Sequence, residues 1–147
     1  IAHDTVHDTF MTGPAHVVEL FHGYTYSAHP LACAAGLASL NIYRDEKLFE
    51  RGTKREAMFA DAVMALKGLP NVVDIRCVGI TAGIDLAPGK EGPGKRGWEA
   101  LNSGFHDHEV LFRTAGDTIA LTPPLIVSED QVGEIMEKVG KVIQAVA

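Results

Sequence analysis

Residues 21–30 (FHGYTYSAHP) place a glycine, an aromatic residue and a threonine directly before a predicted helix. A turn of this type brings backbone N–H groups and hydroxyls close to the helix N-terminus, where the helix dipole favours an anion. The segment therefore indicates a phosphate or carboxylate site. An ordinary capped helix start would use the same residue types, and the residues alone leave both interpretations open.

Arg113 is the second residue that could do chemistry, because it lies in a segment otherwise typical of buried strands. In the strand alternation its side chain faces away from that of Phe112. A buried guanidinium without a partner is costly, so we expect a carboxylate beside it. That partner could be Asp107 or Asp117 of the same chain. It could equally be a ligand carboxylate, which a planar guanidinium binds through two hydrogen bonds.

The sequence gives less support for a metal site or a reactive cysteine than for the anion site and Arg113. His3 and His7 would share a helix face, and His106 and His108 would share a strand face, but neither pair has a recognisable third ligand. A zinc site needs three or four converging ligands, so we expect no metal. Cys33 lies in an apolar helix, where burial would raise the pKa of its thiol and make it inert.

Composition narrows the class of protein. The 147 residues are 46% hydrophobic and 22% charged, which is typical of a globular domain. A net charge of −6 argues against binding to nucleic acid or to anionic membranes. No apolar run approaches the ~20 residues of a membrane span. The two cysteines are far apart in the sequence, which favours a reducing compartment, and we expect the cytoplasm.

The first half of the chain must position residues 21–30. Residues 1–29 have little helical period, whereas residues 31–44 predict a helix that begins after Pro30. Small and apolar residues occupy nearly all sides of this helix, so we expect it to be buried and closely packed. A second helix is predicted over residues 45–66, with an inner face made by Leu48, Phe59, Val63 and Leu66.

The strands that must position Arg113 follow. Val73, Ile75 and Cys77 alternate as one strand, and the parity of the apolar positions changes near Gly79, which indicates a turn or a bulge. Residues 110–114 and 118–122 predict two more strands around a Gly-Asp turn. Pro123 and Pro124 would end the second of them.

Two helices complete the expected fold. Trp98, Leu101 and Phe105 have helical spacing and predict a short helix. Ser128 and Gln131 form a capping-box pattern before a final helix whose apolar stripe runs through Val132, Ile135, Met136, Val139 and Ile143. Antiparallel strands with helices between them predict an α+β fold for the C-terminal two-thirds of the chain.

The two chemical segments together resemble one family. Residues 21–35 (FHGYTYSAHPLACAA) resemble the motif that opens the interface helix of class III pyridoxal-phosphate aminotransferases. Residues 113–125 (RTAGDTIALTPPL) resemble the C-terminal motif of the same class. Both are most similar to the ω-amino acid:pyruvate (β-alanine:pyruvate) branch, and the resemblance covers nearly the whole chain. Ala28 stands where many relatives have glycine, a change that we expect the turn to tolerate.

The resemblance implies roles for three residues. The family has the fold type I aminotransferase architecture and forms dimers with active sites at the subunit interface. By position in the motif, Thr25 would reach the phosphate of pyridoxal 5′-phosphate in the partner subunit, with the backbone of Tyr24 beside it. Arg113 would bind the substrate carboxylate, and in the family this arginine can swing aside for amines that lack one.

The resemblance also implies what is absent. The family places its Schiff-base lysine, and the acidic residue opposite the pyridine nitrogen, upstream of the segment seen here. The lysines present have a different sequence context, so we expect no catalytic residue in this chain. We expect a C-terminal fragment that is inactive alone, with residues 1–44 as the end of the large cofactor-binding domain and the interface helix. Residues 45–147 would then form the small domain.

The expected activity is transfer of an amino group from an ω-amino acid or amine to pyruvate, by a homodimer or higher homo-oligomer. The partners would be a small amino donor and a keto acid. Two alternatives remain at this point. One is a class III aminotransferase with another donor, of the ornithine or glutamate semialdehyde type. The other is a non-catalytic α+β module that dimerises through the helix at residues 31–44.

Overall fold

The computed structural model describes residues 3–14, 16 and 23–147. The chain divides into two compact units, Ile1–Ser39 and Leu40–Ala147. The boundary between the two units lies within the helix of residues 30–45. The domain boundary expected from the sequence lies five residues later, between residues 44 and 45. Residues 21 and 22, which begin the predicted anion-binding segment, lie outside the described residues.

The first unit contains a helix that the sequence did not predict. Helix α1 (Asp4–Phe10) begins after His3, whose ring nitrogen accepts a hydrogen bond from the backbone N–H of Thr5. This cap supplies one of the partners that a helix N-terminus otherwise lacks, so a segment without clear periodicity still forms a short helix.

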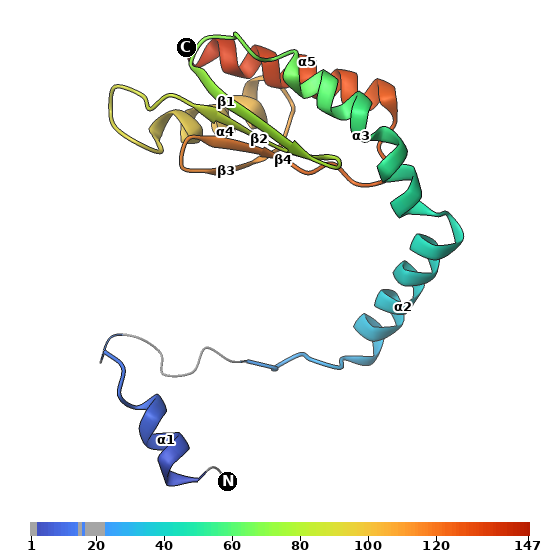
Figure 1. Ribbon diagram of the computed structural model, residues 1–147, viewed down its shortest axis with the longest axis vertical. Helices are drawn as coiled ribbons and strands as arrows, with labels where there is room; N and C mark the ends of the chain where they lie inside the picture. Colours follow the sequence, from blue (N-terminus) through green and yellow to red (C-terminus); the bar gives the residue numbers. More distant parts are fainter. Residues whose placement is uncertain (1–2, 15, 17–22) are drawn as a thin grey trace. The chain divides into compact units, whose positions relative to one another are not determined.

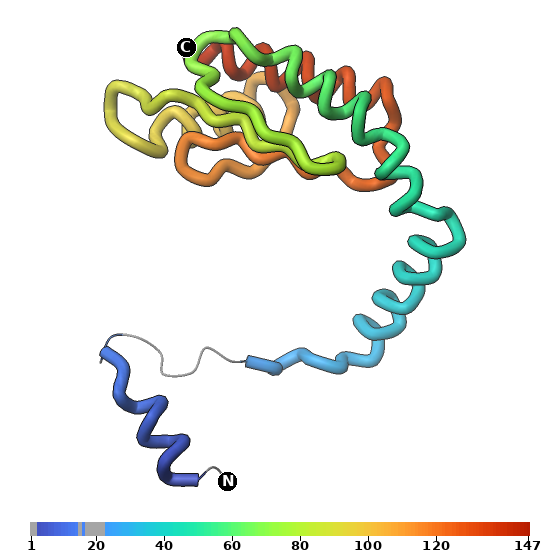
Figure 2. The backbone as a smooth tube through the Cα atoms, in the orientation of Figure 1, coloured from blue at the N-terminus to red at the C-terminus, as the bar shows by residue number. Residues whose placement is uncertain are grey.

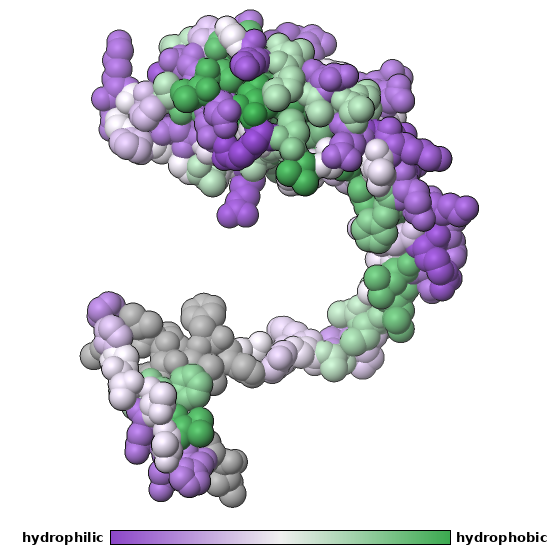
Figure 3. Space-filling view, in the orientation of Figure 1, coloured by the Kyte–Doolittle hydropathy of each residue, from purple (hydrophilic) through white to green (hydrophobic). Residues whose placement is uncertain are grey.

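Helix α2 (Pro30–Asp45) confirms the predicted helix but not its predicted burial. None of its residues is buried in the described structure, and Leu31, Leu37 and Leu40 are 76%, 64% and 65% exposed. Apolar surface, coloured green, is visible along α2 (Figure 3). The sequence pattern shows that a helix can pack closely, but it does not show that the packing partner belongs to the same chain.

A residue in the left-handed backbone conformation, Lys47, separates α2 from the next helix. Lys47 has a φ of 51° and precedes helix α3 (Leu48–Met64), so the predicted start at residue 45 is wrong. The ring of Tyr43 stacks on that of Phe49 across this joint, with centroids 5.3 Å apart. The predicted inner face is confirmed, since its four residues are all buried.

The second unit is built on a four-stranded antiparallel sheet (Figure 1). It contains β1 (Val72–Val78), β2 (Thr81–Leu86), β3 (Arg113–Ala115) and β4 (Thr118–Leu121), in the order β1-β2-β4-β3. Two hairpins therefore lie side by side, and the tube in Figure 2 shows each of them doubling back through a short turn. This arrangement confirms the predicted α+β class.

The first hairpin contains an irregularity that the alternation of Val73, Ile75 and Cys77 does not show. The register between β1 and β2 shifts between Val72 and Asp74, so Val72 packs against the core while Val73 is 68% exposed. The predicted change of parity near Gly79 is a tight turn: Val78 pairs with Thr81, and the φ of Gly79 is 58°.

Three helices cover one face of the sheet: α3, α4 (Lys95–Asp107) and α5 (Glu129–Ala145). Between them and the sheet lies an apolar core, whose fully buried members include Phe59, Ile84, Ile119, Val132, Val139 and Ile143. The capping box is present at the start of α5, as predicted from Ser128 and Gln131. The opposite face of the sheet, called the open face below, carries the exposed and half-buried strand residues.

Of the three residues whose spacing predicts helix α4, Leu101 packs against the core. Trp98 and Phe105 are 60% and 57% exposed, whereas Gly97, Ala100 and Gly104 are buried. A Cβ on Gly97 would overlap the carbonyl oxygen of Gly116, so this helix approaches the sheet through its smallest residues. Glycine, which has no side chain, allows this close approach of two backbones.

Among the described residues, none of the helices combines the length and the apolar character that crossing a membrane requires.

Candidate functional site

Arg113 begins β3, which is the edge strand of the sheet, and its side chain belongs to the open face. It is exposed, so the predicted burial is wrong. The structure records no hydrogen bond or ion pair for it with any described residue. An exposed guanidinium keeps its hydration without a partner, and it remains available to a ligand.

The two carboxylates proposed as internal partners for Arg113 do not bind it. The carboxylate of Asp117 instead accepts hydrogen bonds from the backbone N–H groups of Gly94, at 2.7 Å, and Gly97, at 3.0 Å. These groups start α4, so Asp117 serves as a cap supplied from another element. Asp107 ends α4 and has no recorded bond to Arg113 among the described residues.

A row of four residues crosses the open face from Arg113. Arg113 lies opposite Ala120 on β4, Ala120 opposite Gly83 on β2, and Gly83 opposite Arg76 on β1. The guanidinium of Arg76 lies over Gly83, 3.3 Å from the point where a Cβ on that glycine would stand. Two arginines thus flank two small residues.

Asp85 is the anionic centre of this face, although no motif in the sequence singles it out. It accepts hydrogen bonds from Arg76 at 2.5 Å and from the Thr118 hydroxyl at 2.6 Å. These two bonds, that from Arg76 first, hold the pKa of Asp85 below its ordinary value. Asp74 approaches the same guanidinium at 3.7 Å. Asp85 is paired with Asp74 across the hairpin, and Arg76 lies diagonally from Asp85, so the register of the hairpin would have placed a cation between two carboxylates.

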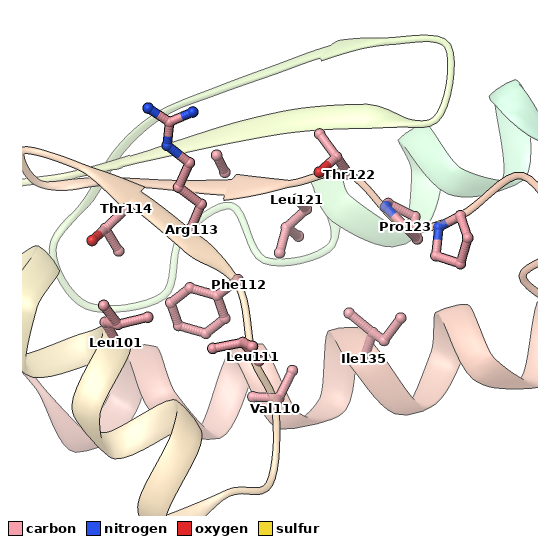
Figure 4. Close-up of a pocket in the computed structure, with 12 residues that line it drawn as sticks. Leu101, Val110, Leu111, Phe112, Arg113, Thr114, Leu121, Thr122, Pro123 and Ile135 are labelled. Carbon is pink, nitrogen blue, oxygen red and sulfur yellow. The ribbon is translucent and has the colours of Figure 1, made fainter. Parts of the chain in front are cut away.

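An apolar pocket of ≈ 670 Å³ lies at the end of the second hairpin (Figure 4). Leu101, Phe112, Leu121 and Ile135 are among its lining residues, and Arg113 and Thr122 contribute polar atoms at its margin. Figure 4 shows Phe112 directed toward the helices and Arg113 directed away from them. The pocket therefore combines an apolar lining with one cation at its edge.

Thr25 and Tyr24 lie in a turn that leads into α2. The Ser27 N–H donates to the Tyr24 carbonyl at 3.0 Å, and the His29 N–H donates to the Tyr26 carbonyl at 3.2 Å. Thr25 is exposed, and its hydroxyl makes no recorded hydrogen bond within the described part of the chain. The first turn of α2 contains no acidic residue, so nothing in that turn opposes an anion.

Ala28 keeps this turn at a conformational cost. Its φ is 62°, in the left-handed region that favours glycine. The positive φ also gives a physical reason for glycine at this position.

The predicted site residues belong to different units: Thr25 to Ile1–Ser39 and Arg113 to Leu40–Ala147. Each is described within its own unit. Of the seven lysines, all but the half-buried Lys138 are exposed. Lys95, Lys138 and Lys141 each pair with the glutamate four residues earlier in the sequence. In the described residues, no three His, Cys, Asp or Glu side chains form a group that could hold a metal ion.

Residues 1–143 match the family described as aminotransferase class-III. The chain belongs to the class III aminotransferases. Enzymes of this family depend on pyridoxal phosphate, and solved transaminase structures share the present fold. A thermostable omega transaminase mutant from Pseudomonas jessenii matches 87% of the chain, and 30% of that structure, with a TM-score of 0.76 and 29% identity.

Two curated class III relatives match almost the entire chain. An omega-aminotransferase from Caulobacter vibrioides is 45% identical over 94% of the chain and 31% of its own length. A beta-alanine–pyruvate aminotransferase from Pseudomonas aeruginosa is 36% identical over 100% of the chain and 33% of its own length. The chain thus spans about a third of these relatives. Proteins named adenosylmethionine-8-amino-7-oxononanoate aminotransferase and gamma-aminobutyrate transaminase also match, each at 35% identity.

Proposed function

We propose that the protein carrying this chain transfers an amino group from an ω-amino acid or amine to pyruvate. The names of the two relatives described above support this donor and acceptor class. The observation that carries the proposal is the exposed Arg113, which has no recorded partner within the described residues while Asp117 is engaged elsewhere.

Arg113 would bind the carboxylate of the donor or of the keto acid. A guanidinium offers two parallel N–H donors that match the two oxygens of a carboxylate. Its place on an edge strand fixes the backbone, while the exposed side chain stays adjustable. Such a contact orients the substrate and lowers the entropy cost of bringing its amino group to the reacting centre.

The turn before α2 fits the phosphate of the cofactor. The Thr25 hydroxyl can donate a hydrogen bond to a phosphate oxygen, with the Tyr24 backbone beside it. The exposed turn and the absence of acidic residues from the first turn of α2 support this assignment. When bound, pyridoxal phosphate supplies the electron sink for amino-group transfer. Thr25 would act only as a phosphate ligand.

A homodimer is the assembly that we propose, with residues 1–44 assigned to the large cofactor-binding domain and residues 45–147 to the small domain. The support is α2, whose apolar and small residues are exposed along its whole length. Contiguous exposed apolar surface typically marks an interaction site. The free thiols of Cys33 and Cys77 support a cytoplasmic location, because cysteines remain reduced there.

The alternative function is a class III aminotransferase with another amino donor. Relatives named for 8-amino-7-oxononanoate and for gamma-aminobutyrate match nearly as well as the beta-alanine relative, and this observation favours it. Arg113 would have the same role with any donor that carries a carboxylate.

The test is a donor panel with the purified protein, pyridoxal phosphate and pyruvate, with formation of alanine as the readout. Beta-alanine and a carboxylate-free aryl amine should both yield alanine. Gamma-aminobutyrate would serve as the competing donor of similar charge. Turnover confined to gamma-aminobutyrate would favour the alternative, and no alanine from any donor would overturn both proposals.

A further inference from the structure

The strand that carries Arg113 is held from one side of the sheet only. β3 has three residues and pairs with β4, and no strand lies beyond it in the described part of the chain. Few hydrogen bonds join so short a strand to its neighbour, so they fix its position weakly. The position of β3 must therefore depend on the turn that follows it and on α4, which packs against it.

Asp117 attaches that turn to two other elements. Both oxygens of its carboxylate accept hydrogen bonds from the start of α4, Oδ2 from the Gly94 N–H and Oδ1 from the Gly97 N–H. Its backbone carbonyl accepts a third hydrogen bond, from the Leu86 N–H at 3.0 Å, at the end of β2. Bonds to an ionised acceptor are stronger than those between neutral groups. A single residue therefore clamps the turn of the second hairpin to its surroundings.

The clamp leaves little room for movement between the turn and α4. Gly97 packs against the backbone of Gly116 so closely that a Cβ on Gly97 would overlap the carbonyl oxygen of Gly116. The Asp117 carboxylate pulls the two segments together, and this contact prevents a closer approach. Because packed backbone yields very little, the two effects together define one position of the hairpin relative to α4.

This position matters for Arg113, whose guanidinium has no recorded partner within the described residues. No described side chain holds the guanidinium in place, so the backbone of β3 sets where it can reach. A binding group must be held within about 0.5 Å of its productive geometry. A misplacement of about 1 Å can lower a rate roughly a hundredfold.

We propose that Asp117 is a positioning residue for substrate recognition: by clamping the turn to α4, it holds Arg113 where both N–H donors of the guanidinium can meet a substrate carboxylate. The carboxylate of Asp117 itself is engaged with α4, so it acts through the hairpin and not on the substrate. A donor without a carboxylate does not use this contact, and its turnover should not depend on Asp117. This inference rests on the proposed substrate role of Arg113.

The first experiment removes the clamp with Asp117→Ala. We expect kcat/KM for beta-alanine to fall about tenfold, mainly through a higher KM, while kcat/KM for a carboxylate-free aryl amine stays within about twofold. Asp117→Asn keeps one acceptor oxygen and should recover part of the loss. It also provides the same test, with a smaller expected effect, if Asp117→Ala does not fold. Equal losses for both donors, or no loss for beta-alanine, would overturn the positioning role.

Ser128→Ala is the matched control for lost stability. Ser128 also caps a helix of the same unit, and its recorded side-chain bond, to the Gln131 N–H at 3.1 Å, stays within the first turn of α5. Loss of either cap should lower the melting temperature measured by circular dichroism. Only Asp117→Ala should change the ratio of kcat/KM for the two donors. An equal change in Ser128→Ala would show a general effect of lost stability and would overturn the proposal.

The second experiment tests whether Asp117 acts through Arg113. In a protein that already carries Arg113→Ala, the addition of Asp117→Ala should change kcat/KM for beta-alanine by less than about twofold, because the side chain to be positioned is absent. A further tenfold loss in the double variant would mean that Asp117 acts independently of Arg113, and it would overturn the inference.

The outcomes separate this inference from the function on which it rests. If Arg113→Ala lowers turnover of both donors equally, the substrate role of Arg113 fails, and the positioning role fails with it. If Arg113→Ala selectively impairs the carboxylate donor while Asp117→Ala leaves the ratio unchanged, the proposed function stands and this inference alone is wrong.

Discussion

Asp117 and Gly97 join the turn of the second hairpin to the first turn of α4. The Asp117 carboxylate accepts a hydrogen bond from the Gly97 N–H at 3.0 Å, while Gly97 itself packs against the backbone of Gly116. The same contact explains two features of the site. It engages Asp117, one of the two carboxylates expected as internal partners for Arg113, and it fixes the hairpin on which Arg113 is placed.

Gly97→Ala should destabilise the protein strongly. The added methyl group would overlap the Gly116 carbonyl oxygen, and backbone on both sides must move to admit it. We expect a loss of about 3 kcal/mol or more in the free energy of unfolding, measured by urea denaturation. Gly133→Ala is the control: this residue of α5 has open space around it, and alanine should stabilise the helix by about 0.5–1 kcal/mol. Equal effects would contradict the close packing of α4.

Arg113→Ala should impair carboxylate-bearing donors selectively. Loss of a bidentate charged contact is expected to lower kcat/KM for beta-alanine about tenfold to a hundredfold, and that for an aryl amine less than about threefold. Steady-state kinetics with pyruvate as acceptor measures both values. Arg113→Lys keeps the charge without the planar fork and should fall between wild type and alanine. Equal losses on both donors would exclude the carboxylate role.

Thr25→Ala should weaken binding of pyridoxal phosphate. One hydrogen bond from a hydroxyl to a charged phosphate contributes about 1.5 kcal/mol, which corresponds to roughly a tenfold rise in the dissociation constant. Absorbance titration of the cofactor-free protein gives this constant directly. Thr25→Ser retains the hydroxyl and should stay near the wild-type value. Unchanged affinity in the alanine variant would show that Thr25 is not a phosphate ligand.

Asp85 should make stability depend on pH in the acid range. The bonds from Arg76 and Thr118 lower the pKa of Asp85 in the folded protein below the unfolded value of roughly 3.9. Its stabilising contribution is therefore complete above the unfolded pKa and is lost as the pH falls through the folded pKa. Urea denaturation between pH 7 and pH 3 should show the advantage of wild type over Asp85→Asn shrinking on acidification. An advantage independent of pH would contradict an ionised, paired Asp85.

The sequence predicted the elements whose signals are local. The capping residues Ser128 and Gln131 gave the start of α5, and the apolar spacing gave the inner face of α3. The helix of residues 30–45 followed from Pro30 and the run after it. These features depend on neighbours within one or two turns, which a single sequence contains.

The errors arose where position depends on distant contacts. The alternation of Val73, Ile75 and Cys77 predicted a strand, but alternation does not reveal the register shift in the pairing of β1 with β2 that leaves Val73 exposed. The spacing of Trp98, Leu101 and Phe105 predicted a helix, but it did not reveal that α4 approaches the sheet through Gly97 and Gly104. Arg113 was expected to be buried because its neighbours are apolar, but β3 is an edge strand with an open face.

The order of strands has a consequence for the path of folding. Each hairpin closes over a short turn, which takes about 1–10 μs, whereas pairing β2 with β4 joins Asp85 to a residue 33 positions away. Pairing β2 with β4 closes a long loop, which costs conformational entropy. We therefore expect this pairing to form after both hairpins have formed. The Thr118–Asp85 hydrogen bond spans this seam and should form late. Thr118→Ala would then hasten unfolding while leaving the refolding rate almost unchanged.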